Sequence, residues 1–282
     1  MSTLILKTTT VFPTTVPFLR RDPMDGPGVV GIYDFTDPFT FGGNMPASVG
    51  NAYSLKAQQD AVEAAVTVNF GAAEPVTNGA IVMKDSQYMR LPEVFRLPST
   101  TKRMAFCVWA ALPKTGWPTG ATAFLALGGL GVGTTTTSQY FLQARITSAG
   151  VVDQIGGAVD GLYTGFGAAD AGEIAALATL VNDLPHQYVV ELDGETTPGT
   201  AIVRFYADGV LRKTTSTAGW DGVLYVPAVG TTPRIGWVSP FLSTAVQRAR
   251  YNRSWVMTPV VGGKTIAAMV AEDYAANAAR FV

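Results

Sequence analysis

The feature that most constrains the fold is the segment 186–215, in which short alternating apolar runs are separated by Asp-Gly pairs. The first run meets Asp193-Gly194 and the second meets Asp208-Gly209. Asp-Gly between two alternating strands is the strongest short-range signal for a β-hairpin, because tight hairpin turns need residues that accept positive φ. The segment therefore predicts an antiparallel meander and an all-β fold.

The chain after residue 28 continues as short β-rich runs bounded by Gly, Pro, Asn and Asp, which is the spacing of a sandwich or barrel. Strands are expected at residues 29–35, 79–83, 88–91, 103–112, 122–127, 139–146, 188–192, 201–207, 210–215, 234–238 and 246–256. Apolar residues recur at helical spacing in 173–184 and 264–281, which predicts two short helices on the sheets. The glycine- and threonine-rich residues 128–137 predict a flexible loop.

The first 28 residues predict an extended arm, and residues 29–282 a single sandwich domain. Four prolines, at positions 13, 17, 23 and 27, exclude a regular helix from the arm. Its apolar side chains would be unfavourable in water, so they are expected to dock on a neighbouring subunit or on the sandwich itself. The residues expected to do so include Val11, Phe12, Phe18 and Leu19. A disordered leader is the alternative.

The amino-acid composition limits the kinds of partner that the protein is expected to bind. Charged residues make up 15% of the chain, against roughly 25% in ordinary soluble domains, and hydrophobic residues make up 48%. No apolar run reaches the roughly 18 residues of a spanning helix, so the low charge predicts a surface covered by other subunits of a homo-oligomer or particle. The net charge of −1, with no basic run longer than Arg20-Arg21, excludes nucleic acid as an expected partner. The first residues lack the pattern of a signal peptide, so the protein is expected to be made in the cytoplasm.

The meander resembles the concanavalin A-like or laminin G-like sandwich families. The positions that match the family pattern are His186, Asp193, Gly194, Tyr206, Asp208 and Gly209. The segments 31–35, 87–92, 104–109 and 250–253 resemble further strands of that family in the same order. The resemblance covers most of residues 29–281 and implies an antiparallel two-sheet jelly-roll sandwich with short helices, one of them C-terminal. Because lectins, hydrolases, adhesins and virion parts share this sandwich, it implies a fold and leaves the activity open.

Three acidic residues, Glu191, Asp193 and Glu195, alternate along the meander as the acidic trio of sandwich-type glycoside hydrolases does. Gly194 argues against catalysis, because a hairpin turn there would leave Asp193 and Glu195 in solvent. His186 is the only histidine and is expected to have a structural role. The single cysteine, Cys107, lies in an apolar run and is expected to be a buried, inert thiol. No catalytic residue is assigned, and the chain is not expected to be an enzyme.

Five aromatic residues occur in Gly- and Pro-rich, loop-like context, where exposed rings stack on sugars or anchor a protein partner. They are Trp117, Tyr163, Phe166, Trp220 and Tyr225. The alternative is that these rings fold back onto the sandwich. Calcium is the usual ion of such lectins, and the loop carboxylates and amides that could hold it are Asp34, Asp37, Asn44, Asp153 and Asp160. These residues lack a fixed-spacing motif, so no metal and no other cofactor is assigned.

The leading hypothesis is a non-catalytic bacteriophage-type virion protein, in the tail, the baseplate or attached to the capsid. It predicts other virion subunits as partners, a homo-oligomer, and a glycan as a further ligand. A carbohydrate-binding module or adhesin is the alternative, and a sandwich-type glycoside hydrolase comes third.

Overall fold

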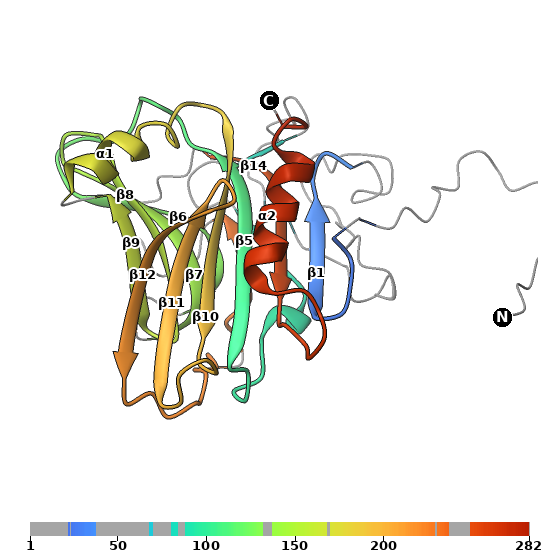
Figure 1. The fold of residues 1–282 in the computed structure, drawn as a ribbon. Coiled ribbons are helices and arrows are strands. Elements are labelled where there is room, and N and C mark those ends of the chain that lie inside the picture. The colour runs from blue at the N-terminus through green and yellow to red at the C-terminus, as the bar shows by residue number, and fades with distance from the viewer. Residues whose placement is uncertain are drawn as a thin grey trace, which may run out of the picture.

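The computed structural model describes residues 22, 24–37, 68–69, 80–83, 88–131, 137–167, 170–228, 230–236 and 249–281. Over these residues the chain folds into two antiparallel sheets packed face to face (Figure 1). Sheet A has the order β1-β14-β5-β10-β11-β12, with β3 paired to β14. Sheet B has the order β2-β4-β13-β6-β7-β8-β9. The antiparallel two-sheet sandwich predicted from the sequence is confirmed.

The strands of sheet A are β1 (Val29–Asp34), β3 (Ile81–Val82), β5 (Arg103–Ala111), β10 (Pro185–Asp193), β11 (Thr200–Ala207), β12 (Val210–Ala218) and β14 (Arg250–Met257). Those of sheet B are β2 (Val68–Asn69), β4 (Tyr88–Arg90), β6 (Ala123–Gly131), β7 (Ser138–Ile146), β8 (Val152–Val159), β9 (Leu162–Gly167) and β13 (Arg234–Gly236). The helices are the 3-10 turn η2 (Glu93–Phe95), α1 (Ala171–Leu177) and α2 (Ile266–Asn277).

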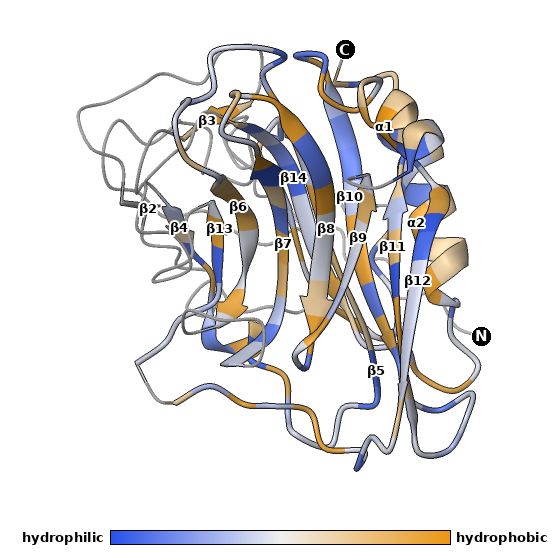
Figure 2. Ribbon diagram, turned by 90° about the vertical axis from the view of Figure 1, so that its left-hand side faces the viewer, coloured by the Kyte–Doolittle hydropathy of each residue, from blue (hydrophilic) through white to orange (hydrophobic). Residues whose placement is uncertain are grey.

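The period-two pattern of the meander explains why its strands have two different faces. Tyr188, Val190 and Leu192 of β10 belong to the core between the sheets, whereas Val189 faces the other way, into a second apolar cluster. Successive side chains of a strand point to opposite faces, so one run of residues supplies both clusters. Figure 2 shows both polar and apolar residues along β11.

The two Asp-Gly pairs behave differently. Asp208 and Gly209 both have positive φ, 53° and 75°, and form the tight turn between β11 and β12 that the sequence predicts. Asp193-Gly194 does not make a tight turn, because β10 ends at Asp193 and β11 begins only at Thr200. Asp193 is buried, with 2% of its surface exposed. The expectation that Asp193 lies in solvent is therefore wrong, whereas Glu195 is exposed as expected.

The prediction of a loop at residues 128–137 is also wrong for its first part. Gly128 and Gly129 lie within β6, which continues to Gly131, while residues 132–136 lie outside the described residues. A Cβ at Gly129 would come within 2.4 Å of the Tyr140 carbonyl oxygen, so the neighbouring strand β7 approaches too closely for any side chain. Glycine here serves close strand packing rather than flexibility.

Sequence reasoning did not predict β8 and β9, which occupy residues 152–167 and carry several small residues in place of an apolar alternation. The helix expected at 173–184 is present but shorter, and α1 ends at Leu177. Asp170 caps it, since its side chain accepts a hydrogen bond from the Glu173 backbone nitrogen. The expected C-terminal helix is confirmed as α2.

Helix α2 lies across the outer face of sheet A (Figure 1). Its residues Ile266, Met269 and Val270 are fully buried and belong to the same apolar cluster as Trp109 of β5 and Trp255 of β14. The Trp109 ring stacks on Tyr274 with centroids 5.9 Å apart. This second apolar cluster therefore fixes α2 to the sheet, in addition to the core between the sheets.

A buried charge network centres on Arg253 of β14, which is 1% exposed. Its guanidinium donates to Asp22 Oδ2 at 2.7 Å, to Asp34 Oδ2 at 3.3 Å and to Asp273 Oδ1 at 2.8 Å. Burial alone would lower the pKa of Arg253, but the three carboxylates outweigh it and raise that pKa. Burial would likewise raise the pKa of Asp22, yet the Arg253 hydrogen bond and charge hold it below its usual value. The network therefore connects four parts of the chain: the segment at residue 22, β1, β14 and α2.

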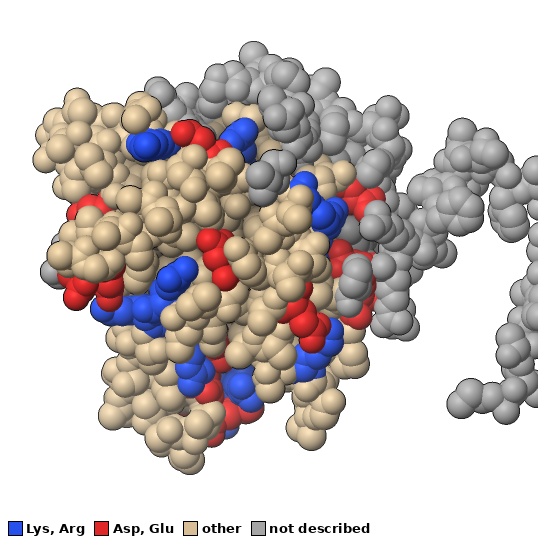
Figure 3. All heavy atoms as spheres, turned by 45° about the horizontal axis from the view of Figure 1, so that its top comes forward, with Lys and Arg blue, Asp and Glu red and all other residues tan. Residues whose placement is uncertain are grey.

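The surface carries few charges, and those in Figure 3 form small groups of mixed sign on a largely uncharged face. Among the described residues, no helix has the length and apolar character needed to cross a bilayer. The arm residues Val11, Phe12, Phe18 and Leu19 lie outside the described residues, and the domain boundary at residue 28 stays a prediction. Within the predicted arm, Asp22 and Met24 are buried against the sandwich.

Candidate functional site

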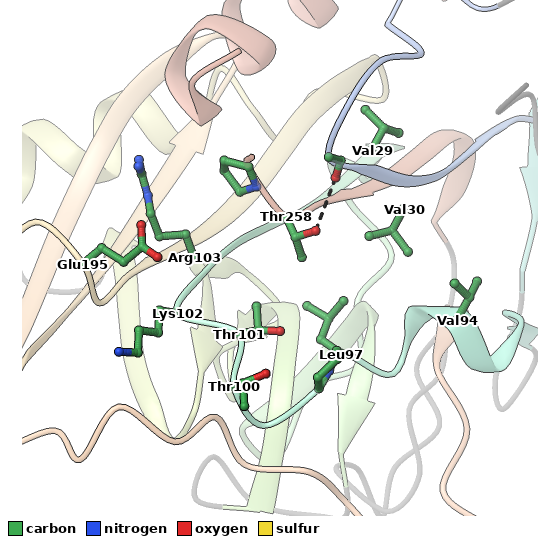
Figure 4. A pocket seen from close by; sticks show the side chains of 13 residues that line it. Val29, Val30, Val94, Leu97, Thr100, Thr101, Lys102, Arg103, Glu195 and Thr258 are labelled. Atoms are coloured by element: carbon green, nitrogen blue, oxygen red, sulfur yellow. Dashed lines mark hydrogen bonds between the residues drawn. The ribbon is translucent and has the colours of Figure 1, made fainter. Parts of the chain in front are cut away.

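A pocket of about 520 Å³ opens at the end of sheet A where β1 and β5 begin and β10 and β14 end (Figure 4). Binding pockets for small ligands commonly have volumes of roughly 300–1,000 Å³. The lining comes from four segments that are far apart in the sequence: Gly28, Val29 and Val30; Val94, Leu97, Pro98 and Thr100 to Arg103; Glu195; and Thr258 and Pro259. The antiparallel order of the strands brings these segments to one end.

The backbone at Leu97, which lines the pocket, is held by a side chain from the other sheet. Gln139 of β7 is fully buried, accepts a hydrogen bond from the Leu97 backbone nitrogen at 2.8 Å and donates one to the Leu97 carbonyl at 2.8 Å. Arg96 donates to the Pro227 carbonyl at 2.7 Å and also bonds the Thr231 carbonyl. The segment between η2 and β5 is thus fixed on both sides, although it is not a regular element.

Gly28 closes another wall. Its carbonyl accepts a hydrogen bond from the Thr258 backbone nitrogen at 2.7 Å, and the Thr258 hydroxyl points toward the same oxygen (Figure 4). Gly28 has a φ of 88°, and a Cβ there would come within 2.5 Å of the Thr258 carbonyl oxygen. Only glycine allows the start of β1 to approach Thr258 this closely.

Asp193 positions Glu195 at the rim. Its carboxylate accepts hydrogen bonds from the Glu195 and Thr196 backbone nitrogens at 3.2 and 3.0 Å and from the Thr196 hydroxyl at 2.7 Å. Burial would raise the pKa of Asp193, but these bonds and the one from Arg204 lower it, so the side chain is charged at neutral pH. Glu195 itself is exposed, and its side chain lies beside Arg103 (Figure 4).

The chemistry of the lining is mixed. Thr100, Thr101 and Thr258 supply hydroxyls, which both donate and accept hydrogen bonds, and Glu195 supplies a carboxylate that accepts. Val29, Val30 and Leu97 form an aliphatic wall opposite Glu195 (Figure 4). The Lys102 side chain extends away from that wall. Lys102 and Arg103 add two cationic groups to the lining. Such a lining fits a ligand that carries both hydroxyl groups and an apolar face.

The acidic trio of the hydrolase hypothesis is divided by the structure. Glu191 and Asp193 share one guanidinium, since Arg204 Nη1 lies 2.9 Å from Glu191 Oε1 and 3.2 Å from Asp193 Oδ2. The Tyr206 hydroxyl donates to Glu191 Oε2 at 2.5 Å. Burial raises the pKa of Glu191, although Tyr206 and Arg204 oppose that shift. Both carboxylates are buried, and their oxygens accept hydrogen bonds from Arg204, Tyr206 and Thr196. Of the three acidic residues, Glu195 lines the pocket.

None of the five predicted aromatic residues lines the pocket. Trp117 and Phe166 are each 5% exposed and pack into the core between the sheets. Tyr163 and Phe166 belong to β9 rather than to a loop, and the Tyr163 ring stacks on Phe141 with centroids 6.3 Å apart. Sugar binding by these rings stays a prediction.

Trp220 and Tyr225 are brought together by the turn between β8 and β9. Asp160, at a φ of 52°, accepts hydrogen bonds from the Trp220 indole nitrogen at 2.6 Å and from the Tyr225 backbone nitrogen at 2.7 Å. The Trp220 ring covers Gly194, where a Cβ would lie 1.8 Å from the ring. Both aromatics are partly buried, and Trp220 helps to hold the loop that carries Glu195.

The remaining candidates have structural partners. His186 lies between Asp208 Oδ2 at 2.7 Å and Asn182 Oδ1 at 2.9 Å. Cys107 is fully buried, and that burial raises the pKa of its thiol.

The described residues contain no group of three or more His, Cys, Asp and Glu side chains arranged to hold a metal ion. Of the calcium candidates, Asp34 is used in the Arg253 network and Asp160 bonds Trp220 and Tyr225. Asp153 pairs with Arg145 at 2.6 Å, and Asp37 lies at the end of the turn after β1. Asn44 lies outside the described residues.

Sequence reasoning missed every pocket residue except Glu195. The threonines at 100, 101 and 258 belong to no motif, and threonine is common throughout the chain. The only local signal is a short polar stretch directly before an apolar strand, at 98–103, which is ordinary for a loop. Their common role follows from the topology and not from spacing in the sequence.

No family model matches the chain, and no curated protein matches it either. Solved structures do match. Trypanosoma rangeli sialidase in complex with sialic acid matches at a TM-score of 0.55 and 11% identity, over 91% of this chain and 34% of that chain. The binding domain of botulinum neurotoxin serotype D matches at a TM-score of 0.52 and 9% identity, over 88% of this chain and 51% of that one. The chain thus spans about a third of the sialidase chain and half of the neurotoxin binding-domain chain, and the class that these matches define is the β-sandwich fold.

Proposed function

We propose that this chain is a non-catalytic binding protein that takes a sugar residue of a glycan in the pocket at the end of sheet A. The observation that carries the proposal is the lining, which combines threonine hydroxyls, one exposed carboxylate and an aliphatic wall. A sugar ring presents hydroxyls at its edge and C–H groups on its face, so both halves of the lining have a counterpart. The fold is shared with a sialidase solved with sialic acid, which supports a glycan as the ligand class.

The pocket also has the rigidity that weak sugar binding requires. Gln139 fixes Leu97, Thr258 bonds Gly28, and Asp193 fixes the backbone at Glu195. A site that is already formed before binding loses little conformational entropy when the ligand enters. No aromatic ring is found among the described residues that line the pocket, which predicts that recognition depends on hydrogen bonds more than on stacking.

Replacing Glu195 with glutamine is expected to weaken glycan binding by about 10- to 100-fold. Replacing Thr101 with valine is expected to weaken it by about 2- to 10-fold, because a neutral hydrogen bond contributes roughly 0.5–1.5 kcal/mol. Each change removes hydrogen bonds from a buried ligand hydroxyl, a loss of roughly 1.5–3 kcal/mol where a charged acceptor is involved. A glycan array identifies the ligand, and calorimetry on that ligand measures the affinity. Thr197→Val is the matched control, because Thr197 is exposed in the same loop and does not line the pocket. A blank array for the unmodified protein would remove the proposal.

We further propose that this binding serves a bacteriophage-type virion, in which the chain is a tail, baseplate or capsid-attached subunit. The low charged fraction of 15% and the apolar, proline-rich residues 1–28 support contact with other subunits. Full-length protein is then expected to have a larger molar mass in light scattering than a variant that lacks residues 1–21. Equal masses would contradict a role of these residues in assembly. Mass spectrometry of purified particles would test the virion assignment itself.

A further inference from the structure

The outer edge of sheet A at β12 has backbone groups without a partner strand among the described residues. β12 is the last strand of the sheet and pairs only with β11 on its other side (Figure 1). Val210 and Leu211 are 50% and 48% exposed, and Thr214, Ser216, Thr217 and Ala218 are exposed as well. An exposed strand edge of this length is a template for pairing with another chain.

The tight turn at Asp208-Gly209 determines which backbone groups point outward. In a two-residue hairpin the residues that flank the turn, Ala207 and Val210, form a hydrogen-bonded pair, and pairs then alternate along the strands. In the β11–β12 register beyond the bulge at Arg212, the pairs that are not hydrogen-bonded contain Thr214, Ser216 and Ala218. The far end agrees with this assignment, because the Thr200 nitrogen, opposite Ala218, donates to the Thr197 carbonyl. The N–H and C=O groups of these three residues therefore face away from β11.

In the described part of the chain, residues 214–218 of β12 lack several of the usual devices that protect an edge strand, although β9 of sheet B packs near β12. Natural proteins protect such edges with proline, with a free lysine or with a bulge. Residues 214–218 contain neither proline nor charge, and the bulge lies before them, at Arg212. Lys213 is engaged by Glu173 of α1 at 2.6 Å, and the Arg212 guanidinium lies over the Phe166 ring at 5.8 Å. The opposite edge of the sheet, β1, is shorter and bulged near Val29.

We propose that β12 pairs with β12 of a second copy of this chain, antiparallel and centred on Ser216. In this register Ser216 lies opposite itself and Thr214 lies opposite Ala218, so all three outward residues exchange hydrogen bonds. Centring the pair on Lys213 would place two lysines opposite each other, whereas centring it on Ser216 leaves only small uncharged residues in the ladder. The two copies of sheet A then form one continuous sheet across a two-fold axis. This inference concerns a surface that shares no residue with the glycan pocket.

Ser216→Lys tests the pairing, because it places two ammonium groups opposite each other at the two-fold axis. The full chain with this change is expected to have half the molar mass of the unmodified protein in light scattering, with self-association weakened at least ~10-fold. Ser216→Ala is the matched control, since it keeps the backbone N–H and adds no charge. Ser216 faces solvent on an edge strand, so both variants are expected to fold, and an unchanged circular dichroism spectrum checks this.

Disulfide cross-linking gives a second, independent test of the β12–β12 pairing. Directly opposed residues of a hydrogen-bonded antiparallel pair have Cα atoms about 5.5 Å apart, which fits a disulfide. Ser216→Cys is expected to form a covalent dimer under mild oxidation, while the unmodified protein does not, because Cys107 is fully buried. Ser148→Cys, in the exposed turn between β7 and β8, measures cross-linking by random collision. Three results would each overturn the proposal. They are equal cross-linking of Ser216→Cys and Ser148→Cys, a monomeric unmodified protein, and equal molar masses for Ser216→Lys and Ser216→Ala. Unchanged glycan binding by Ser216→Lys would show that pairing at β12 and binding in the pocket are independent of each other.

Discussion

Arg253→Met is expected to lower the free energy of unfolding by about 3–5 kcal/mol, the range measured when one partner of a buried ion pair is removed. Methionine has a similar length and fills the space, so the loss is electrostatic rather than a cavity. Asp22 and Asp273 would stay buried without a cation, whereas Asp34 would keep its contact with Arg280 at 3.0 Å. Urea denaturation at neutral pH measures the change.

Arg145→Met is the matched control for this experiment. Arg145 also forms an ion pair, with Asp153 at 2.6 Å, but the two side chains are 31% and 22% exposed. Partly exposed pairs contribute roughly 0–1 kcal/mol, because water solvates both ions when the pair is broken. Equal losses for the two variants would show that the buried network has no special weight in the stability of the fold.

The meander was predictable because its signals are local. Alternation in β10 and β11 follows from the two-residue period of a strand, and Asp208-Gly209 has the side chains that its positive φ angles require. Helix α2 was predictable for a similar reason, since its apolar residues recur at helical spacing and Thr265 caps its first turn. In each case the residues that decide the structure are near neighbours in the sequence.

Strands β8 and β9 were not predictable in this way. Gly156, Gly157 and Gly165 occupy strand positions because neighbouring atoms leave no space for a side chain: a Cβ at Gly157 would come within 2.8 Å of Val190 in sheet A. From the sequence alone, glycine that permits close packing cannot be distinguished from glycine that permits a turn. The same ambiguity caused the wrong loop prediction at Gly128 and Gly129.

The role of Asp193 was predicted wrongly, and the cause is similar. Asp-Gly suggested a turn, but Asp193 ends a strand and its carboxylate organises the longer loop that follows. Its partner Arg204 comes from the next strand, opposite Glu191. The ion pairs that bury Glu191 and Asp193 thus depend on the pairing of β10 with β11, which is not visible in the residues next to them in the sequence. The pocket depends on residues that lie even farther apart in the sequence, because its walls meet only after both sheets have formed.

Asp273→Leu is expected to destabilise the protein by about 3–5 kcal/mol and to loosen α2 from sheet A. Asp273 is fully buried and accepts hydrogen bonds from the Trp109 indole nitrogen at 2.7 Å, from Gln187 at 2.8 Å and from Arg253 at 2.8 Å. Leucine is close in size, but it leaves the Trp109 indole nitrogen without its acceptor and removes one carboxylate from the buried Arg253, which keeps Asp22 and Asp34. Gln187 keeps its bond to the Val270 carbonyl at 3.1 Å. A buried donor without a partner costs roughly 1–3 kcal/mol, and removing one partner of a buried ion pair costs more.

The reactivity of Cys107 reports this loosening directly. Its sulfur lies 4.0 Å from Asp273 Oδ2, so a thiol reagent can reach it only when α2 moves away. Cys107 is expected to be unreactive in the unmodified protein and to react in Asp273→Leu under conditions where the sheets stay folded. Glu272→Leu is the control, because Glu272 is 48% exposed and pairs with the exposed Lys264 on the solvent side of the helix. If Cys107 stayed protected in Asp273→Leu, the apolar contacts of Ile266, Met269 and Val270 alone would be holding α2 in place.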